Sequence, residues 1–285
     1  MQFETAYIET NGIKLHVVMA GPKDGQPVFL LHGFPEFWLG WLQQVEPLAK
    51  AGYRVIVPDQ RGYNLSDKPK GVKAYSVDKL VDDILGLINV LGYEKVNLIG
   101  HDWGGLVAWA LAFWYPERLH KLGILNTPHP AVMYNFLRRG DPEQLRNSWY
   151  MFAFQFPWLP EYFLRRNDWR RTVLALRGSG KVHTFTNDDI AKYKKAWSQP
   201  GAITAMLNWY RAGRYIPRLL KETYVKVPTL LIWGMKDKAL SHRMARPSMD
   251  YCDDGKLVFF EDATHWVQHD EAEAVNQLLT KFLSR

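Results

Sequence analysis

The chain has 285 residues, of which 47% are hydrophobic and 23% are charged. This length and composition predict one folded domain, or one domain with an insertion, and exclude an intrinsically disordered chain. A single cysteine, Cys252, excludes a disulfide scaffold and a cysteine-based zinc site, and it fits a reducing compartment. The first dozen residues do not resemble a secretory signal, and no uncharged stretch reaches the roughly 18 residues of a transmembrane helix. We therefore expect a cytoplasmic protein without membrane insertion.

The net charge of +7 is concentrated in one part of the chain. Residues 130–222 contain 16 Lys and Arg against 7 Asp and Glu, whereas the remaining residues contain 20 against 22. Basic runs of this kind are typical of solvated helix faces, and no signature of a nucleic-acid-binding fold accompanies them. The basicity therefore predicts a charged surface and no nucleic acid partner.

Short apolar runs alternate with stretches of helical spacing along most of the chain. In chain order, the pattern predicts strands at 15–20, 28–32 and 54–58, a helix at 77–91, a strand at 96–100, a helix at 106–114, strands at 122–126, 229–233 and 257–260, and a helix from about 271 to 283. Several of the strands are apolar throughout, as in a sheet that is covered on both faces. The alternation indicates an α/β fold with a mostly parallel central sheet flanked by helices.

The series of strands is interrupted at Pro130. From there to Thr229 the chain has helical spacing and many aromatic residues but no strand signal. We interpret residues 130–222 as a helical cap inserted into a core domain that comprises residues 1–129 and 223–285. No low-complexity linker flanks this segment, so the cap is expected to pack onto the core domain.

The most informative motif is GHDWGG at residues 100–105, between a predicted strand and a predicted helix. Small residues at 100 and 104 permit a sharp turn that exposes the side chain of Asp102 above the carboxyl edge of the sheet. A carboxylate there can displace a leaving group from an sp3 carbon and form an ester, and the start of the helix favours its ionised form. Taken alone, the motif is also compatible with an Asp that merely caps the helix.

Four further positions complete a candidate catalytic set. The backbone N–H groups of Phe34, in the turn HGFP, and of Trp103 can form an oxyanion hole for an ester carbonyl under attack by water. That attack needs a base, and His265 follows the strand at 257–260. Asp237 follows the strand at 229–233 and offers a carboxylate that orients the imidazole. Each of these residues alone would be weak evidence for a catalytic site. Their order along the chain, nucleophile, acid and then histidine, is the order found in hydrolases of this architecture and supports the assignment.

Several motifs together resemble the α/β-hydrolase-fold epoxide hydrolases, and they extend over almost the whole chain. They are HGFPEFW (32–38), DQRGYNLSDKP (59–69), GHDWGG (100–105), NTPHP (126–130), LNWYR (207–211) and THW (264–266). The resemblance implies the α/β-hydrolase fold and conversion of an epoxide and water to a vicinal diol through an ester of the enzyme. It implies Asp102 as the nucleophile, His265 as the general base and Asp237 as the acidic partner of His265.

The resemblance also implies two cap tyrosines that hydrogen-bond the epoxide oxygen, which map onto Tyr150 and Tyr210. A phenol suits this task because ring opening places negative charge on that oxygen. The cap has six tyrosines, and any single one is more often a packing or surface residue. Apolar walls for a small hydrophobic epoxide are expected from five aromatic residues that are equally compatible with plain core: Trp38, Trp103, Trp149, Phe154 and Trp209.

No cofactor or metal is expected, because the chain has no dinucleotide fingerprint or phosphate loop and the pair His265 and His269 has no matching third ligand. Two alternatives stay open: a haloalkane or haloacid dehalogenase with the same nucleophile, and a receptor of this fold with little turnover. Phe34, where dehalogenases usually carry Asn, argues against the first, and the intact Asp-His-Asp set argues against the second. The sequence is compatible with a monomer or a homodimer.

Overall fold

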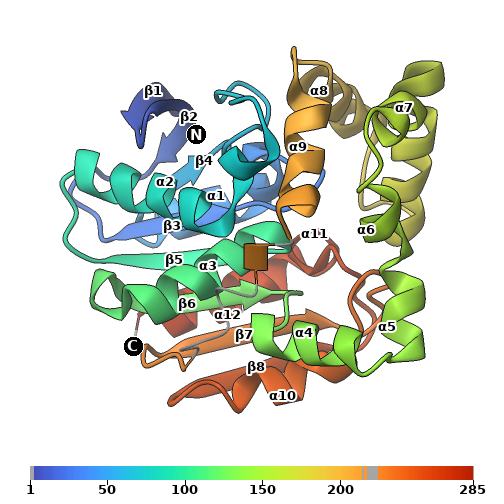
Figure 1. Cartoon of the computed structure of the whole chain (residues 1–285). Coiled ribbons are helices and arrows are strands. Elements are labelled where there is room, and N and C mark those ends of the chain that lie inside the picture. The colour runs from blue at the N-terminus through green and yellow to red at the C-terminus, as the bar shows by residue number, and fades with distance from the viewer. Residues whose placement is uncertain (1–2, 214, 217–223, 285) are drawn as a thin grey trace.

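The computed structural model describes residues 3–213, 215–216 and 224–284 (Figure 1). Eight strands in these residues form one sheet in the order β1-β2-β4-β3-β5-β6-β7-β8. β1 and β4 pair with β2 in antiparallel fashion, and all pairs from β4 to β8 are parallel. The strands are β1 (Glu4–Thr10), β2 (Ile13–Ala20), β3 (Pro27–Leu31), β4 (Arg54–Pro58), β5 (Val96–His101), β6 (Leu119–Leu125), β7 (Thr229–Gly234) and β8 (Gly255–Phe260).

The predicted mostly parallel sheet is confirmed, and every strand expected from the sequence is present. β3, β4, β5 and β7 are buried along their full length, as their continuous apolar runs predict. β1 was not predicted. It lies at the edge of the sheet as one arm of a hairpin with β2, so most of its residues are exposed and it lacks a continuous apolar run.

Helices cover both faces of the sheet. They are α1 (Leu42–Lys50), α2 (Val77–Val90), α3 (Trp103–Trp114), α10 (Ala245–Met249), α11 (Val267–Asp270) and α12 (Ala272–Leu283). β3 shows how the apolar core is divided, since Phe29 and Leu31 belong to a cluster with α2 and α3, whereas Val28 and Leu30 belong to a cluster with α1 and α12. α3 is buried almost all round, which explains why its sequence is apolar on every face.

The segment between β6 and β7 is helical, as its spacing predicts, and lies along one side of the sheet (Figure 1). Its longer helices in the described residues are α4 (Pro130–Arg138), α5 (Pro142–Asn147), α6 (Trp149–Ala153), α7 (Leu159–Ser179), α8 (Asn187–Trp197) and α9 (Ala202–Arg211). α7 is interrupted at Arg166 to Trp169, where the backbone angles are not helical. The boundary expected at residue 222 lies outside the described residues, so the division into core and cap stays a prediction.

Candidate active site

Asp102 occupies a sharp turn between β5 and α3. Its backbone φ is 51°, a strained value for a residue with a side chain. The turn is possible because its neighbours are glycines: a Cβ at Gly100 would lie 2.4 Å from the carbonyl oxygen of Gly104, and one at Gly104 would lie 2.2 Å from that of Leu31. The local sequence thus exposes one carboxylate at the carboxyl end of a central strand.

The carboxylate of Asp102 meets one backbone donor and one imidazole. The N–H of Phe34 donates to Oδ1 over 2.8 Å, and Nε2 of His265 lies 3.6 Å from Oδ2, an ion-pair separation. Burial on its own would raise the pKa of Asp102, but His265, His101 and the N–H of Phe34 together lower it below its usual value. Trp103 is the first residue of α3, and the role of its N–H as a second oxyanion donor stays a prediction.

His265 and Asp237 form a buried pair. Nδ1–H of His265 donates to Oδ2 of Asp237 over 2.8 Å, so Nε2 faces Asp102. Burial opposes protonation of His265, yet the negative charges of Asp237 and Asp102 on either side raise its pKa to about 10. At neutral pH the imidazole is therefore protonated and lies between two carboxylates.

Asn126 holds Asp237 in place, a role that the sequence did not reveal. Its side-chain amide donates to Oδ2 of Asp237 over 2.7 Å, while the backbone N–H groups of Ala239 and Leu240 donate to Oδ1 over 2.7 and 2.9 Å. Asn126 directly follows β6 and has a φ of 46°. The sequence did contain one indication of this role. Asn126 stands in the motif NTPHP at the carboxyl end of a strand, and Asn tolerates the left-handed backbone region that a sharp turn requires there.

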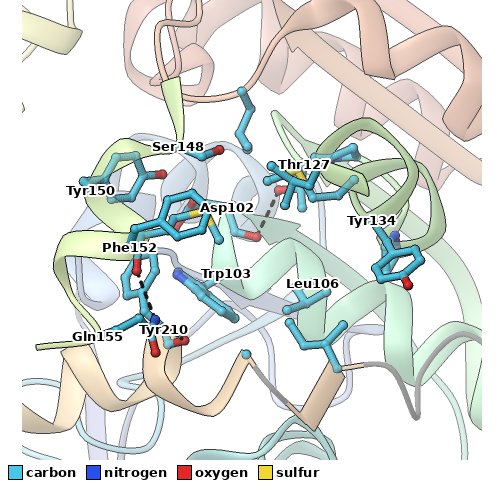
Figure 2. Close-up of a pocket in the computed structure, with 18 residues that line it drawn as sticks. Asp102, Trp103, Leu106, Thr127, Tyr134, Ser148, Tyr150, Phe152, Gln155 and Tyr210 are labelled. Atoms are coloured by element: carbon cyan, nitrogen blue, oxygen red, sulfur yellow. Dashed lines mark hydrogen bonds between the residues drawn. The ribbon is translucent and has the colours of Figure 1, made fainter. Parts of the chain in front are cut away.

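Tyr150 and Tyr210 lie together in the cavity that contains Asp102 (Figure 2). They come from α6 and α9, and their ring centroids are 5.8 Å apart. Burial and the negative charge of Asp102 raise the pKa of both phenols above the ordinary value. Both side chains are therefore neutral hydroxyl donors beside the carboxylate.

Two polar side chains tie α6 to α9 and so fix the distance between the two tyrosines. The amide of Gln155 donates to the carbonyl oxygen of Tyr210 over 3.1 Å. Arg211 donates to the carbonyl oxygens of Phe154 and Phe156 over 2.9 and 2.7 Å, and it forms a bidentate pair with Glu161 over 2.7 and 3.0 Å. These bonds connect residues at least 50 positions apart in the sequence, so no local pattern predicts them.

Two cavities share Asp102, Tyr150 and Tyr210. The smaller, of about 430 Å³, extends toward α4 past Leu106 and Tyr134. The larger, of about 690 Å³, extends toward α7. Both are lined mainly by apolar side chains, and three of the expected wall residues are among them: Trp103 in the smaller cavity, and Trp149 and Phe154 in the larger.

Two expected wall residues lie elsewhere. Trp38 lines neither cavity; its ring packs against Phe3 and Phe37. Trp209 is fully buried behind the site, where its indole N–H donates to the carbonyl oxygen of Arg61 over 2.9 Å. Trp209 points to the core because successive helix residues face different directions, so that Tyr210 can face the cavity and its neighbour cannot.

A buried charged cluster adjoins the site and was missed in the sequence. The carboxylate of Glu36 accepts hydrogen bonds from the hydroxyl of Tyr193 over 2.6 Å and from Nε2 of His269 over 2.8 Å. His101 lies 3.7 Å from Glu36, and its Nε2–H donates to the carbonyl oxygen of His265 over 2.8 Å. Burial would raise the pKa of Glu36, but the two histidines lower it to about 2. The available signal was an acidic residue directly after HGFP, inside an otherwise apolar turn.

His269 thus pairs with Glu36, and no group of three or more potential metal ligands occurs in the described part of the chain. No described helix is both long and apolar enough to cross a membrane.

The fold and the geometry at Asp102 define an enzyme of the α/β-hydrolase class, and comparison with known proteins agrees. The family profile of the alpha/beta hydrolase fold matches residues 26–272. A Bacillus subtilis AB hydrolase superfamily protein is 50% identical over 277 residues, which cover 97% of this chain and 96% of that protein. Human epoxide hydrolase 4 is 38% identical over 97% of this chain and 77% of that protein.

Solved structures point the same way. A Bacillus megaterium epoxide hydrolase in complex with an inhibitor has a TM-score of 0.89 and 32% identity, covering 98% of this chain and 100% of that chain. Epoxide hydrolase A from Mycobacterium thermoresistibile has a TM-score of 0.87 and 28% identity, covering 99% of this chain and 98% of that chain. The chain belongs to the epoxide hydrolases of the α/β-hydrolase-fold family.

Proposed function

We propose that this chain converts an epoxide and water to a vicinal diol through an ester on Asp102. The observation that carries the proposal is that Asp102 lies 3.6 Å from Nε2 of His265 and lines the same two cavities as Tyr150 and Tyr210. A carboxylate nucleophile, an acid for the leaving oxygen and a base for ester hydrolysis are the three groups that this chemistry requires.

In the first step, a carboxylate oxygen of Asp102 attacks a ring carbon and the bond from that carbon to the epoxide oxygen breaks. Tyr150 and Tyr210 hydrogen-bond the oxygen, and one of them donates its proton. The negative charge of Asp102 is lost as the ester forms. The pKa of His265 then falls, because one of its two flanking carboxylates is gone, and its proton replaces the one lost by the tyrosine.

In the second step, neutral His265 removes a proton from water, and the hydroxide attacks the ester carbonyl. Backbone N–H groups at Phe34 and Trp103 stabilise the oxyanion. Collapse of this intermediate releases the diol and restores the ionised Asp102 and the protonated His265. Protons and charges therefore balance over the cycle, without a cofactor or a metal ion.

The phenol pair favours an epoxide over a haloalkane or haloacid as the substrate. An alkoxide leaving group is a strong base and needs a proton, whereas halide leaves without one. The apolar lining of both cavities suits a hydrophobic epoxide.

A single turnover with excess enzyme in oxygen-18 water tests the covalent route. The first diol formed should be largely free of label, because its new oxygen comes from Asp102, and the label should appear in the enzyme. Labelled diol after one turnover would show that water attacks the epoxide directly. A failure to convert styrene-type, terminal aliphatic and trans-disubstituted epoxides would contradict the activity itself.

We further propose a cytoplasmic location, which the single cysteine supports. Fractionation of cells that produce the tagged chain tests this, and recovery from an oxidising compartment would contradict it.

A further inference from the structure

The cap exposes an unusual number of aromatic side chains at one place. In the segment 149–162, called the aromatic segment here, five rings are between 53% and 71% exposed: Trp149, Phe152, Phe156, Trp158 and Tyr162. It comprises α6, the residues that follow it and the start of α7. Large exposed apolar side chains that gather in one segment are typical of an interaction site.

Basic side chains adjoin the aromatic segment. Arg165, Arg166, Arg170 and Arg171 are all exposed, and none of them forms an ion pair within the described part of the chain. The guanidinium of Arg166 lies 5.8 Å from the ring centroid of Tyr162, so cations and rings are intermixed. The nearby acids are already paired, Glu161 with Arg211 and Asp168 with Lys194. The surface therefore carries uncompensated positive charge, within the segment that holds the excess of Lys and Arg.

The aromatic segment also borders the larger cavity. Trp149 and Phe156 are exposed and at the same time line the cavity that reaches Asp102, and Arg171 lines it from α7. A partner that binds the aromatic segment would therefore lie next to the opening of the cavity that reaches Asp102.

We propose that the aromatic segment and its four arginines dock the cap onto the surface of an anionic lipid bilayer. Trp, Tyr and Phe side chains favour the membrane interface, and each basic residue near an anionic surface adds about 1 kcal/mol of attraction. A second copy of this chain fits less well, since a symmetric contact would bring the arginines of both copies together. If the chain hydrolyses apolar epoxides, as proposed above, docking places the larger cavity at the phase in which such substrates dissolve.

Sedimentation with vesicles tests docking without any substrate. The full chain should bind vesicles of phosphatidylcholine with 30% phosphatidylglycerol more tightly than vesicles of phosphatidylcholine alone, and high salt should weaken this binding. The double variant Arg165→Gln/Arg166→Gln should bind the anionic vesicles about 30-fold more weakly, which corresponds to the attraction of two basic residues. Trp158→Ser/Tyr162→Ser should bind more weakly at both low and high salt, because it removes the apolar part.

Matched controls lie on the core domain. Lys73→Gln/Lys95→Gln removes two charges there, and Val90→Ser removes an exposed apolar side chain, so neither change should alter vesicle binding. None of the four variants alters a residue at Asp102, so turnover of a water-soluble epoxide without vesicles should be unchanged.

Two outcomes would overturn the proposal. One is an absence of binding by the full chain at millimolar anionic lipid. The other is a dimer, measured by light scattering, that Trp158→Ser/Tyr162→Ser dissociates while vesicle binding stays unchanged. Because the assay contains no epoxide, binding by a chain without epoxide hydrolase activity would refute the proposed function and leave the docking surface standing.

Discussion

The site contains residues from the sheet region and from the helical segment, and the two regions hold their residues in place by different contacts. Asp102, Asp237 and His265 each follow a strand of the sheet and are held by buried bonds to nearby backbone and side chains. Tyr150 and Tyr210 come from two helices, and bonds of Gln155 and Arg211 set their separation. The sheet therefore fixes the carboxylate of Asp102 and the imidazole of His265, whereas the helical segment positions the two tyrosines through contacts between distant segments. In the proposed mechanism, substitutions in the helical segment should consequently slow alkylation of Asp102, whereas substitution of His265 should slow hydrolysis of the ester.

The largest effect is expected in the core, at His265. His265→Gln should allow the ester to form but not to hydrolyse, so each enzyme molecule should react with one epoxide and release no diol. Intact-protein mass spectrometry should then show a mass increase equal to that of the epoxide. The control Asp102→Ala/His265→Gln should show no adduct. An inactive His265→Gln enzyme of unchanged mass would mean that alkylation also depends on this histidine.

The cap tyrosines should act on the earlier step. Tyr150→Phe and Tyr210→Phe should each slow alkylation, and the double variant should lose most of the roughly 10²- to 10⁴-fold that general-acid catalysis contributes. Phe keeps the ring packing, so the fold should be unaffected. Stopped-flow tryptophan fluorescence can follow alkylation, with Tyr162→Phe as an exposed control. Normal alkylation in both single variants would identify other cap tyrosines as the donors.

Substitution of Arg211 tests whether the hydrogen bonds that join α9 to the end of α6 affect alkylation without affecting ester hydrolysis. Arg211→Met leaves the largely buried Glu161 unpaired, which should lower the free energy of unfolding by about 3 kcal/mol. Arg211→Met/Glu161→Met should recover most of that stability in urea denaturation, since no buried charge remains. Alkylation should stay slow in both, because the bonds to Phe154 and Phe156 are missing. Slow ester hydrolysis with normal alkylation would contradict this division.

The smallest effect is expected at Gly213, on the wall of the smaller cavity. Among the residues that the structure describes, a Cβ there would meet only Ile216, at 3.7 Å, so a larger side chain can enter the cavity without a clash with their backbone. Gly213→Leu should lower kcat/KM about tenfold for epoxides substituted on both carbons, and less for terminal epoxides, which can place their single substituent in the larger cavity. Gly178→Leu, in open space on α7, is the matched control. Equal losses for both substrate classes would mean that the smaller cavity binds no substituent.

The sequence determined the parts of this protein that depend on local pattern. Apolar runs specified the buried strands, because a strand covered on both faces needs apolar residues throughout. The GHDWGG motif specified the turn at Asp102, because only small residues fit at 100 and 104. Chain order placed Asp237 and His265 after their strands, and parallel strands end at one edge of the sheet.

Tertiary structure decided what depends on contacts between distant segments. Asn126 reaches Asp237 across 111 positions of sequence, and Tyr193 reaches Glu36 across 157. No local pattern indicates which polar side chains will be buried together. The direction in which a helix side chain points also depends on tertiary packing. The packing of α9 on the sheet buries Trp209 in the core and places Tyr210 in the wall of the cavity. Composition and spacing specify which elements form, and packing decides which of their side chains meet.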